Sequence, residues 1–141
     1  MLEKEGKKWS VDETFDKEFE VEYVDAHINK ELVFLHKKSK TLIEADMLFN
    51  MPAHEQYSKT GESATSGVFS GLFAKLNSIE GNAIWQRRFA WYLISAKDRN
   101  GWNKSVQKIE KWDFENIVPA HGESIVGNGK TIWRRVMEWH L

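Results

Sequence analysis

Two short apolar runs joined by a polar turn place the strongest constraint on this chain. Residues 31–36 read ELVFLH and residues 40–46 read KTLIEAD, and the polar residues Lys37 to Lys40 link them. Apolar residues at consecutive positions are typical of strands that are buried on both faces, and a short polar link predicts a β-hairpin. The sequence therefore predicts a hairpin within a sheet, and it predicts that these side chains are largely buried: Leu32, Phe34, Leu42 and Ile43, with Val118 beside them.

The other segments alternate between strand and helix patterns. Residues 17–25 alternate apolar and acidic side chains, which predicts a first strand, and residues 116–119 predict a last one. Apolar residues at helical spacing predict helices over 68–76, 84–94, 102–112 and 130–140, and residues 50–63 read as a long polar loop. This order predicts a mixed α/β layer structure.

Length and composition indicate one globular domain. The chain has 141 residues, of which 41% are hydrophobic and 29% charged, and these values exclude disordered and collagen-like classes. The sequence has no run of 18 apolar residues, so a membrane-spanning helix is not expected. We expect a loose N-terminal segment over residues 1–16 and a folded domain over residues 17–141.

Charge and cysteine content narrow the function classes. Lysine and arginine total 20 against 21 aspartates and glutamates, and this balance gives no net attraction to nucleic acid. The absence of cysteine excludes disulfides, thiolate metal sites and a cysteine nucleophile. The charged N-terminus has no apolar signal region, so the sequence predicts a cytoplasmic protein.

Three polar residues lie where predicted strands end. Asp46 ends the run TLIEAD, His121 follows the strand NIVP, and His27 lies just after the first strand. Ligands of α/β proteins bind at strand ends, and a carboxylate with two imidazoles is the composition of a zinc or iron site. The competing interpretation is that these residues are solvated or cap helices. The other histidines have non-catalytic interpretations. We expect His36 at the edge of the hairpin, His54 in a solvated loop, and His140 at a helix end, where it caps carbonyls.

The stretch DAHINKELVFLHKKSKTLIEADMLFN, followed by ENIVPAHG, resembles the C-terminal half of the metallo-β-lactamase superfamily. The loop LFNMPAHEQYSKTGESATSG and the closing WRRVMEWHL are similar to a group of fungal metallo-β-lactamase-like proteins without a settled activity. This resemblance covers about residues 17–141. It implies part of a four-layer αββα sandwich, with one mixed sheet and helices on one side.

The resemblance also implies a metal site and shows what that site lacks. His27 would serve one metal, His121 the other, and Asp46 would bridge the two. The superfamily's H-x-H-x-D-H element, which supplies most of the metal ligands, does not occur in this sequence. A catalytic zinc needs about three protein ligands and an open position, so we expect zinc binding to be weak or absent.

These observations support hypotheses from different classes. The first is a truncated metallo-hydrolase-like domain that is inactive as an isolated monomer. The alternatives are a non-catalytic protein-interaction or structural module, and a metal-dependent hydrolase completed by dimerisation. The missing half would leave one sheet face without its covering sheet, which predicts a homodimer or a protein partner over that face. A further alternative is that the chain is a fragment of a longer enzyme, which would show the same sequence features.

Overall fold

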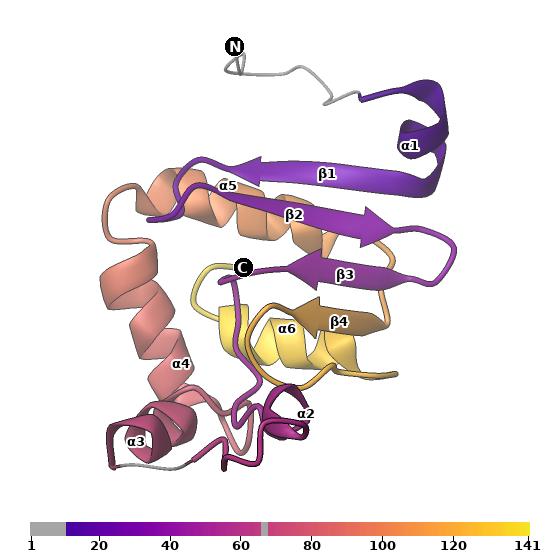
Figure 1. Cartoon of the computed structure of the whole chain (residues 1–141). Coiled ribbons are helices and arrows are strands. Elements are labelled where there is room, and N and C mark those ends of the chain that lie inside the picture. The colour runs from indigo at the N-terminus through magenta and orange to yellow at the C-terminus, as the bar shows by residue number, and fades with distance from the viewer. Residues whose placement is uncertain (1–10, 66–67) are drawn as a thin grey trace.

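The computed structural model describes residues 11–65 and 68–141, and it shows an α/β fold with one open, mixed sheet (Figure 1). Strands β1 (Phe19–Val24), β2 (Glu31–His36) and β3 (Thr41–Glu44) form an antiparallel meander. Strand β4 (Asn116–Pro119) pairs with β3 in parallel, so the spatial order is β1-β2-β3-β4. The predicted hairpin and the predicted mixed sheet are both confirmed.

The turn between β2 and β3 is the polar link that the sequence predicts. The amide of Lys40 donates to the carbonyl of Lys37 over 3.2 Å, and Lys40 adopts a left-handed φ of 50°. The ring Nδ1 of His36 lies 2.7 Å from the Ser39 hydroxyl at the same turn. His36 is therefore a hairpin-edge residue, as predicted.

The N-terminal part of the described chain differs from the prediction. Residues Glu13–Glu18 form a short helix, α1, so the first strand begins at Phe19 instead of residue 17. The Asp12 carboxylate caps this helix by accepting from the amides of Thr14 and Phe15 over 2.9 Å. The predicted loose segment 1–16 thus overlaps a helix, and residues 1–10 lie outside the described residues.

The helices lie close to the predicted ranges. The predicted loop 50–63 contains a four-residue helix, α2 (His54–Tyr57), and α3 spans Val68–Leu76. The predicted helix 84–94 is α4 (Ile84–Phe89) continued by a π-helical turn, η1 (Ala90–Ile94). Helices α5 (Arg99–Glu110) and α6 (Gly129–Met137) match the last two predicted helices, with shifted ends.

The core lies between one face of the sheet and helices α5 and α6, which both pack behind the sheet in Figure 1. Its largest fully buried side chains include two of the tryptophans, Trp102 of α5 and Trp133 of α6. The core contains residues of the sheet (Val33, Leu35, Leu42 and Ile117) and residues of the two helices (Val106, Ile109, Val136 and Met137). These two tryptophans therefore pack in the core, whereas Trp85 is 52% exposed.

The other sheet face carries an apolar row that crosses all four strands, and we call it the open face. Cross-strand pairing aligns its side chains Val21, Leu32, Phe34, Ile43 and Val118, and Phe15 of α1 packs edge-to-face on Phe34 with 6.3 Å between ring centroids. The prediction that Leu32 and Ile43 are largely buried is wrong, because Leu32 is 45% and Ile43 37% exposed, whereas Phe34 is half-buried. Val118 lies beside Ile43 in the same sheet, as predicted, and is 40% exposed. Leu42 is buried as predicted, since alternate residues of a strand point to opposite faces.

Within the described ranges, no helix combines the length and the apolar character that crossing a bilayer requires.

Candidate functional site

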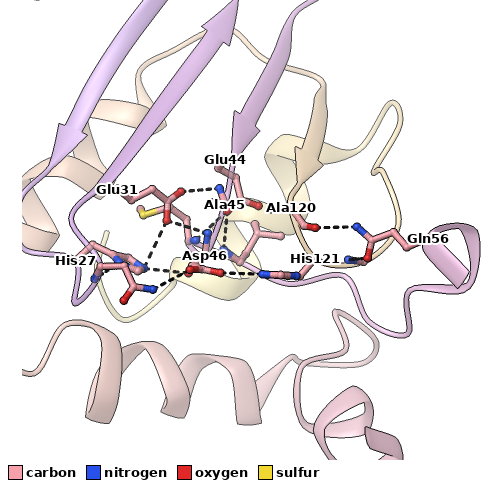
Figure 2. Close-up of polar contacts among 12 residues, drawn as sticks. His27, Glu31, Glu44, Ala45, Asp46, Gln56, Ala120 and His121 are labelled. Carbon is pink, nitrogen blue, oxygen red and sulfur yellow. Dashed lines mark hydrogen bonds and ion pairs between the residues drawn. The ribbon is translucent and has the colours of Figure 1, made fainter. Parts of the chain in front are cut away.

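The candidate site forms where the parallel strands β3 and β4 end side by side (Figure 2). Asp46 follows β3 and His121 follows β4, each two residues beyond the end of its strand. The carboxylate Oδ1 of Asp46 lies 3.5 Å from the ring Nε2 of His121. The topology therefore brings together two residues that are far apart in the sequence.

The chain holds His121 in place through a close backbone approach. Gly122 has a φ of +110°, and a Cβ at this position would lie 2.2 Å from the carbonyl oxygen of Asn50. Only glycine allows that contact, which lets the Asn50 amide donate to the His121 carbonyl over 3.3 Å. The His121 ring stacks on Phe49 with 5.8 Å between centroids, while its side chain stays 57% exposed.

The turn between β1 and β2 holds Asp46 from the opposite side. The Asp46 amide donates to Glu31 Oε2 over 2.8 Å, and the Asp46 carbonyl lies 3.2 Å from the ring Nε2 of His27. The side-chain amide of Asn29 donates to Asp46 Oδ2 over 2.9 Å. Oδ1 of Asp46 thus points toward His121, while its amide, carbonyl and Oδ2 contact Glu31, His27 and Asn29.

His27 is a buried part of this clamp. Its Nδ1 accepts from the amide of Asn29 over 2.9 Å, so the hydrogen-bond network places the ring proton on Nε2, which donates to the Asp46 carbonyl. Desolvation by burial lowers the pKa of His27, and this effect outweighs the hydrogen bond and the charge of Asp46. Ligation of a metal by His27 requires its ring to leave these hydrogen bonds.

Two buried glutamates behind Asp46 were not predicted from the sequence. Burial raises the pKa of Glu31 to about 7, although its two oxygens accept from the amides of Ala45 and Asp46 over 2.8 Å. Glu44 is 4% exposed, and desolvation, with the nearby charge of Glu31, raises its pKa well above the usual range. Its Oε2 accepts from the amide of Met47, while its Oε1 is buried without a hydrogen-bond partner.

A cavity of about 360 Å³ opens beside these groups. His27, Asp46 and His121 all line it, together with the side chains of Phe49, Phe73 and Phe89. Its size lies within the range of small-molecule sites. The three residues that the sequence singled out therefore meet at one cavity, with His27 buried behind the other two.

The donor set fits part of a zinc site. Two donors on one tetrahedral zinc, each at about 2.0–2.2 Å, lie roughly 3.3–3.6 Å apart, and the separation of Asp46 Oδ1 and His121 Nε2 is 3.5 Å. Among the described residues, however, no group of three or more histidine and carboxylate side chains could hold a metal ion. The part of the chain that the structure describes thus does not by itself fit a catalytic zinc.

No family model, curated protein or solved structure matches this chain. The likeness to the metallo-β-lactamase superfamily therefore stays a prediction from the sequence.

The remaining histidines have separate environments. His54 is exposed in α2, which agrees with the predicted solvated position. His140 is 2% exposed, and neither of its ring nitrogens contacts a helix carbonyl, so the predicted helix-capping role is wrong. Its ring contacts Trp91 and Trp102, with centroid distances of 5.2 and 5.8 Å, and its Nδ1 lies 2.8 Å from Asn103 Oδ1. Burial, with the charge of Arg99, lowers the pKa of His140 to about 4.

Proposed function

We propose that this chain is one half of a metallo-β-lactamase-like αββα sandwich that binds a small molecule but does not hydrolyse it alone. The observation that carries the proposal is the Asp46–His121 pair, whose Oδ1 and Nε2 atoms lie 3.5 Å apart at the rim of the cavity. These residues follow adjacent parallel strands, which is where α/β proteins bind their ligands.

The reason for catalytic silence is the number of ligands. A catalytic zinc uses three protein ligands and keeps a fourth position open. Asp46 and His121 offer two, while both ring nitrogens of His27 and both oxygens of Glu31 are already hydrogen-bonded within the chain. Under this proposal a further donor comes from a second chain or from residues outside the ranges that the structure describes. Under this proposal the isolated chain holds zinc weakly.

Cobalt titration tests the proposal, because cobalt(II) binds at zinc sites and its visible absorption reports the number of ligands. We expect a weak site, with a dissociation constant above about 10 μM, that is lost in Asp46→Asn and in His121→Ala. The matched control is His54→Ala, an exposed histidine outside the cavity. A tight site with stoichiometric metal would contradict the half-site proposal, and binding unaffected by either variant would contradict the assignment of these two residues.

A second candidate function is self-association through the open face. The supporting observation is the exposure of Leu32, Ile43 and Val118 in a row that the strand register makes continuous. A flat apolar face can pack on its own copy about a two-fold axis, and a formal charge of −1 gives two copies little reason to repel. We therefore propose a second copy of this chain as the occupant, in a cytoplasmic protein without nucleic-acid or membrane partners.

A further inference from the structure

The cavity beside Asp46 has an apolar wall made of three aromatic rings. Phe49 lies between Phe73 of α3 and Phe89 of α4, with ring centroids 6.1 and 6.0 Å apart and interplanar angles of 80° and 75°. Edge-to-face packing of this kind holds rings in fixed orientations. Leu93 and Ile94 of η1 extend the wall. This side of the cavity fits a flat or aliphatic body and offers it no hydrogen bonds.

Another part of the cavity lining is polar and includes the carboxylate of Asp46. Asp46 is the one acidic side chain among the described residues that line the cavity, and lysine and arginine are absent from that lining. Its nearest polar side chains are the neutral amide of Asn29 and the ring of His121. Gln56 adds an amide, which donates to the Ala120 carbonyl over 2.7 Å. A ligand in this cavity therefore meets a carboxylate that no lysine or arginine of the lining neutralises.

From this charge distribution we propose that the metal-free cavity selects an amphipathic amine: a small apolar body against the phenylalanine rings and an ammonium group at Asp46. An anionic group at the same place would face the carboxylate, and the lining offers no lysine or arginine to receive it. The inference deepens the proposed function and rests on it for the location of the ligand. The inference adds that the cavity prefers a cationic head group to an anionic one.

The test uses three probes with one apolar body and different head groups: 4-phenylbutylamine, 4-phenylbutanol and 4-phenylbutyrate. Binding to the full chain is measured by ligand-detected NMR and calorimetry at pH 7 in the presence of EDTA. We expect the amine to bind about fivefold more tightly than the alcohol, which is the size of one partly exposed ion pair. The carboxylate is expected to bind more weakly than the alcohol.

Two variants test the polar and the apolar parts of the cavity lining separately. Asp46→Asn is expected to bring the amine and the alcohol to the same affinity, because it removes the charge and keeps the shape. Phe73→Ala is expected to weaken all three probes by a similar factor, because it removes one wall that the three bodies share. Val126→Ala is the control, since Val126 is 79% exposed and lies outside this cavity.

The outcomes of this test are distinct from those of the cobalt titration. Equal binding of the three probes, preference for the carboxylate, no binding at millimolar concentration, or an amine preference that survives Asp46→Asn would each overturn the inference. If cobalt binds through Asp46 and His121 without an amine preference, the inference fails and the proposed function stands. If the amine is preferred but cobalt does not bind, the metal-ligand part of the proposed function fails alone.

Discussion

The ring Nε2 of His27 lies 3.2 Å from the backbone carbonyl of Asp46, a residue 19 positions further along the chain. The contact joins the β1–β2 turn to the segment after β3, and the amide of Asn29 engages the other ring nitrogen. His27 therefore acts on Asp46 through its backbone, while the Asp46 carboxylate remains directed at the cavity and His121.

Replacing His27 tests this positioning role. We expect His27→Ala to lower the free energy of unfolding by about 2–4 kcal/mol, because it opens a space beside Trp102 and leaves the Asn29 amide and the Asp46 carbonyl unpaired. Urea unfolding at pH 7 measures the change. The control is His54→Ala, at an exposed histidine, with an expected change within about 0.5 kcal/mol. Equal effects of the two variants would contradict the role of His27.

The buried carboxyl of Glu44 predicts a pH dependence of stability. Its pKa is raised in the folded chain, so the folded state binds its proton more tightly, and stability is lost as pH rises above the unfolded value of about 4.5. Glu44→Gln removes this loss, and it also removes the repulsion that the charge of Glu31 exerts on the Glu44 carboxylate. We expect the free energy of unfolding of the variant to rise relative to that of the unsubstituted chain as the pH goes from 5 to 8.

Urea unfolding at pH 5 and pH 8 measures the change in the free energy of unfolding that Glu44→Gln causes. An exposed glutamate supplies the control: Glu55→Gln in α2 is expected to leave the pH profile unchanged. A Glu44→Gln curve that runs parallel to that of the unsubstituted chain would show that Glu44 does not titrate as argued.

The buried ring of His140 predicts a pH dependence of stability with the opposite sign. Its pKa is about 4 in the folded chain and about 6.5 when unfolded, so the unfolded state binds more protons between these values. Stability is therefore lost as pH falls from about 6.5 to 4, by about 3 kcal/mol for this residue. His140→Phe keeps an aromatic ring beside Trp91 and Trp102 and is expected to remove this part of the acid sensitivity.

The measurement is urea unfolding of the His140→Phe variant and the unsubstituted chain at pH 7 and pH 4.5. His36→Phe, at the exposed hairpin, is the matched control and should keep the acid sensitivity. If His140→Phe is as acid-sensitive as the unsubstituted chain, the source of that sensitivity lies elsewhere.

The open face predicts a dimer. We expect light scattering on a size-exclusion column to give twice the mass of the chain at micromolar concentration. Ile43→Lys is expected to give a monomer, because it places a charge at the centre of the apolar row, where Ile43 pairs with Phe34 and Val118. Val126→Lys, at a residue that is 79% exposed, should leave the dimer intact. A monomeric unsubstituted chain would reject the second copy as the occupant.

Periodicity in the sequence was enough to predict most elements of the fold. Apolar runs located β2, β3 and β4, and helical spacing located α3, α5 and α6. Helix α1 was missed because residues 1–16 are mostly polar and were predicted to be loose, while Lys17 and Glu18 were assigned to the first strand. The Asp12 cap and the stacking of Phe15 on Phe19, with 4.8 Å between ring centroids, stabilise the helix instead. The exposure of Ile43 was missed because consecutive apolar residues do not reveal whether both sheet faces are covered.

The residues of the candidate site that line the cavity could be predicted from the sequence, whereas the buried glutamates behind them could not. Asp46 and His121 could be found because strand ends are recognisable in the sequence. Glu31 and Glu44 could not, since their hydrogen-bond partners are backbone amides that only the folded chain brings near them. The lowered pKa of His27 has the same origin, because it follows from burial and burial follows from the packing of the whole domain.

The parallel pairing of β3 with β4 also has a consequence for the order of folding. Lys40 and Glu115, which form an ion pair at the start of these strands, are 75 positions apart, whereas β1, β2 and β3 are joined by short turns. Local contacts form before distant ones, because closing a long loop costs more chain entropy. The meander with His27 and Asp46 can therefore assemble early. We therefore expect His121 to join the site only when β4 docks, which would complete the cavity late in folding.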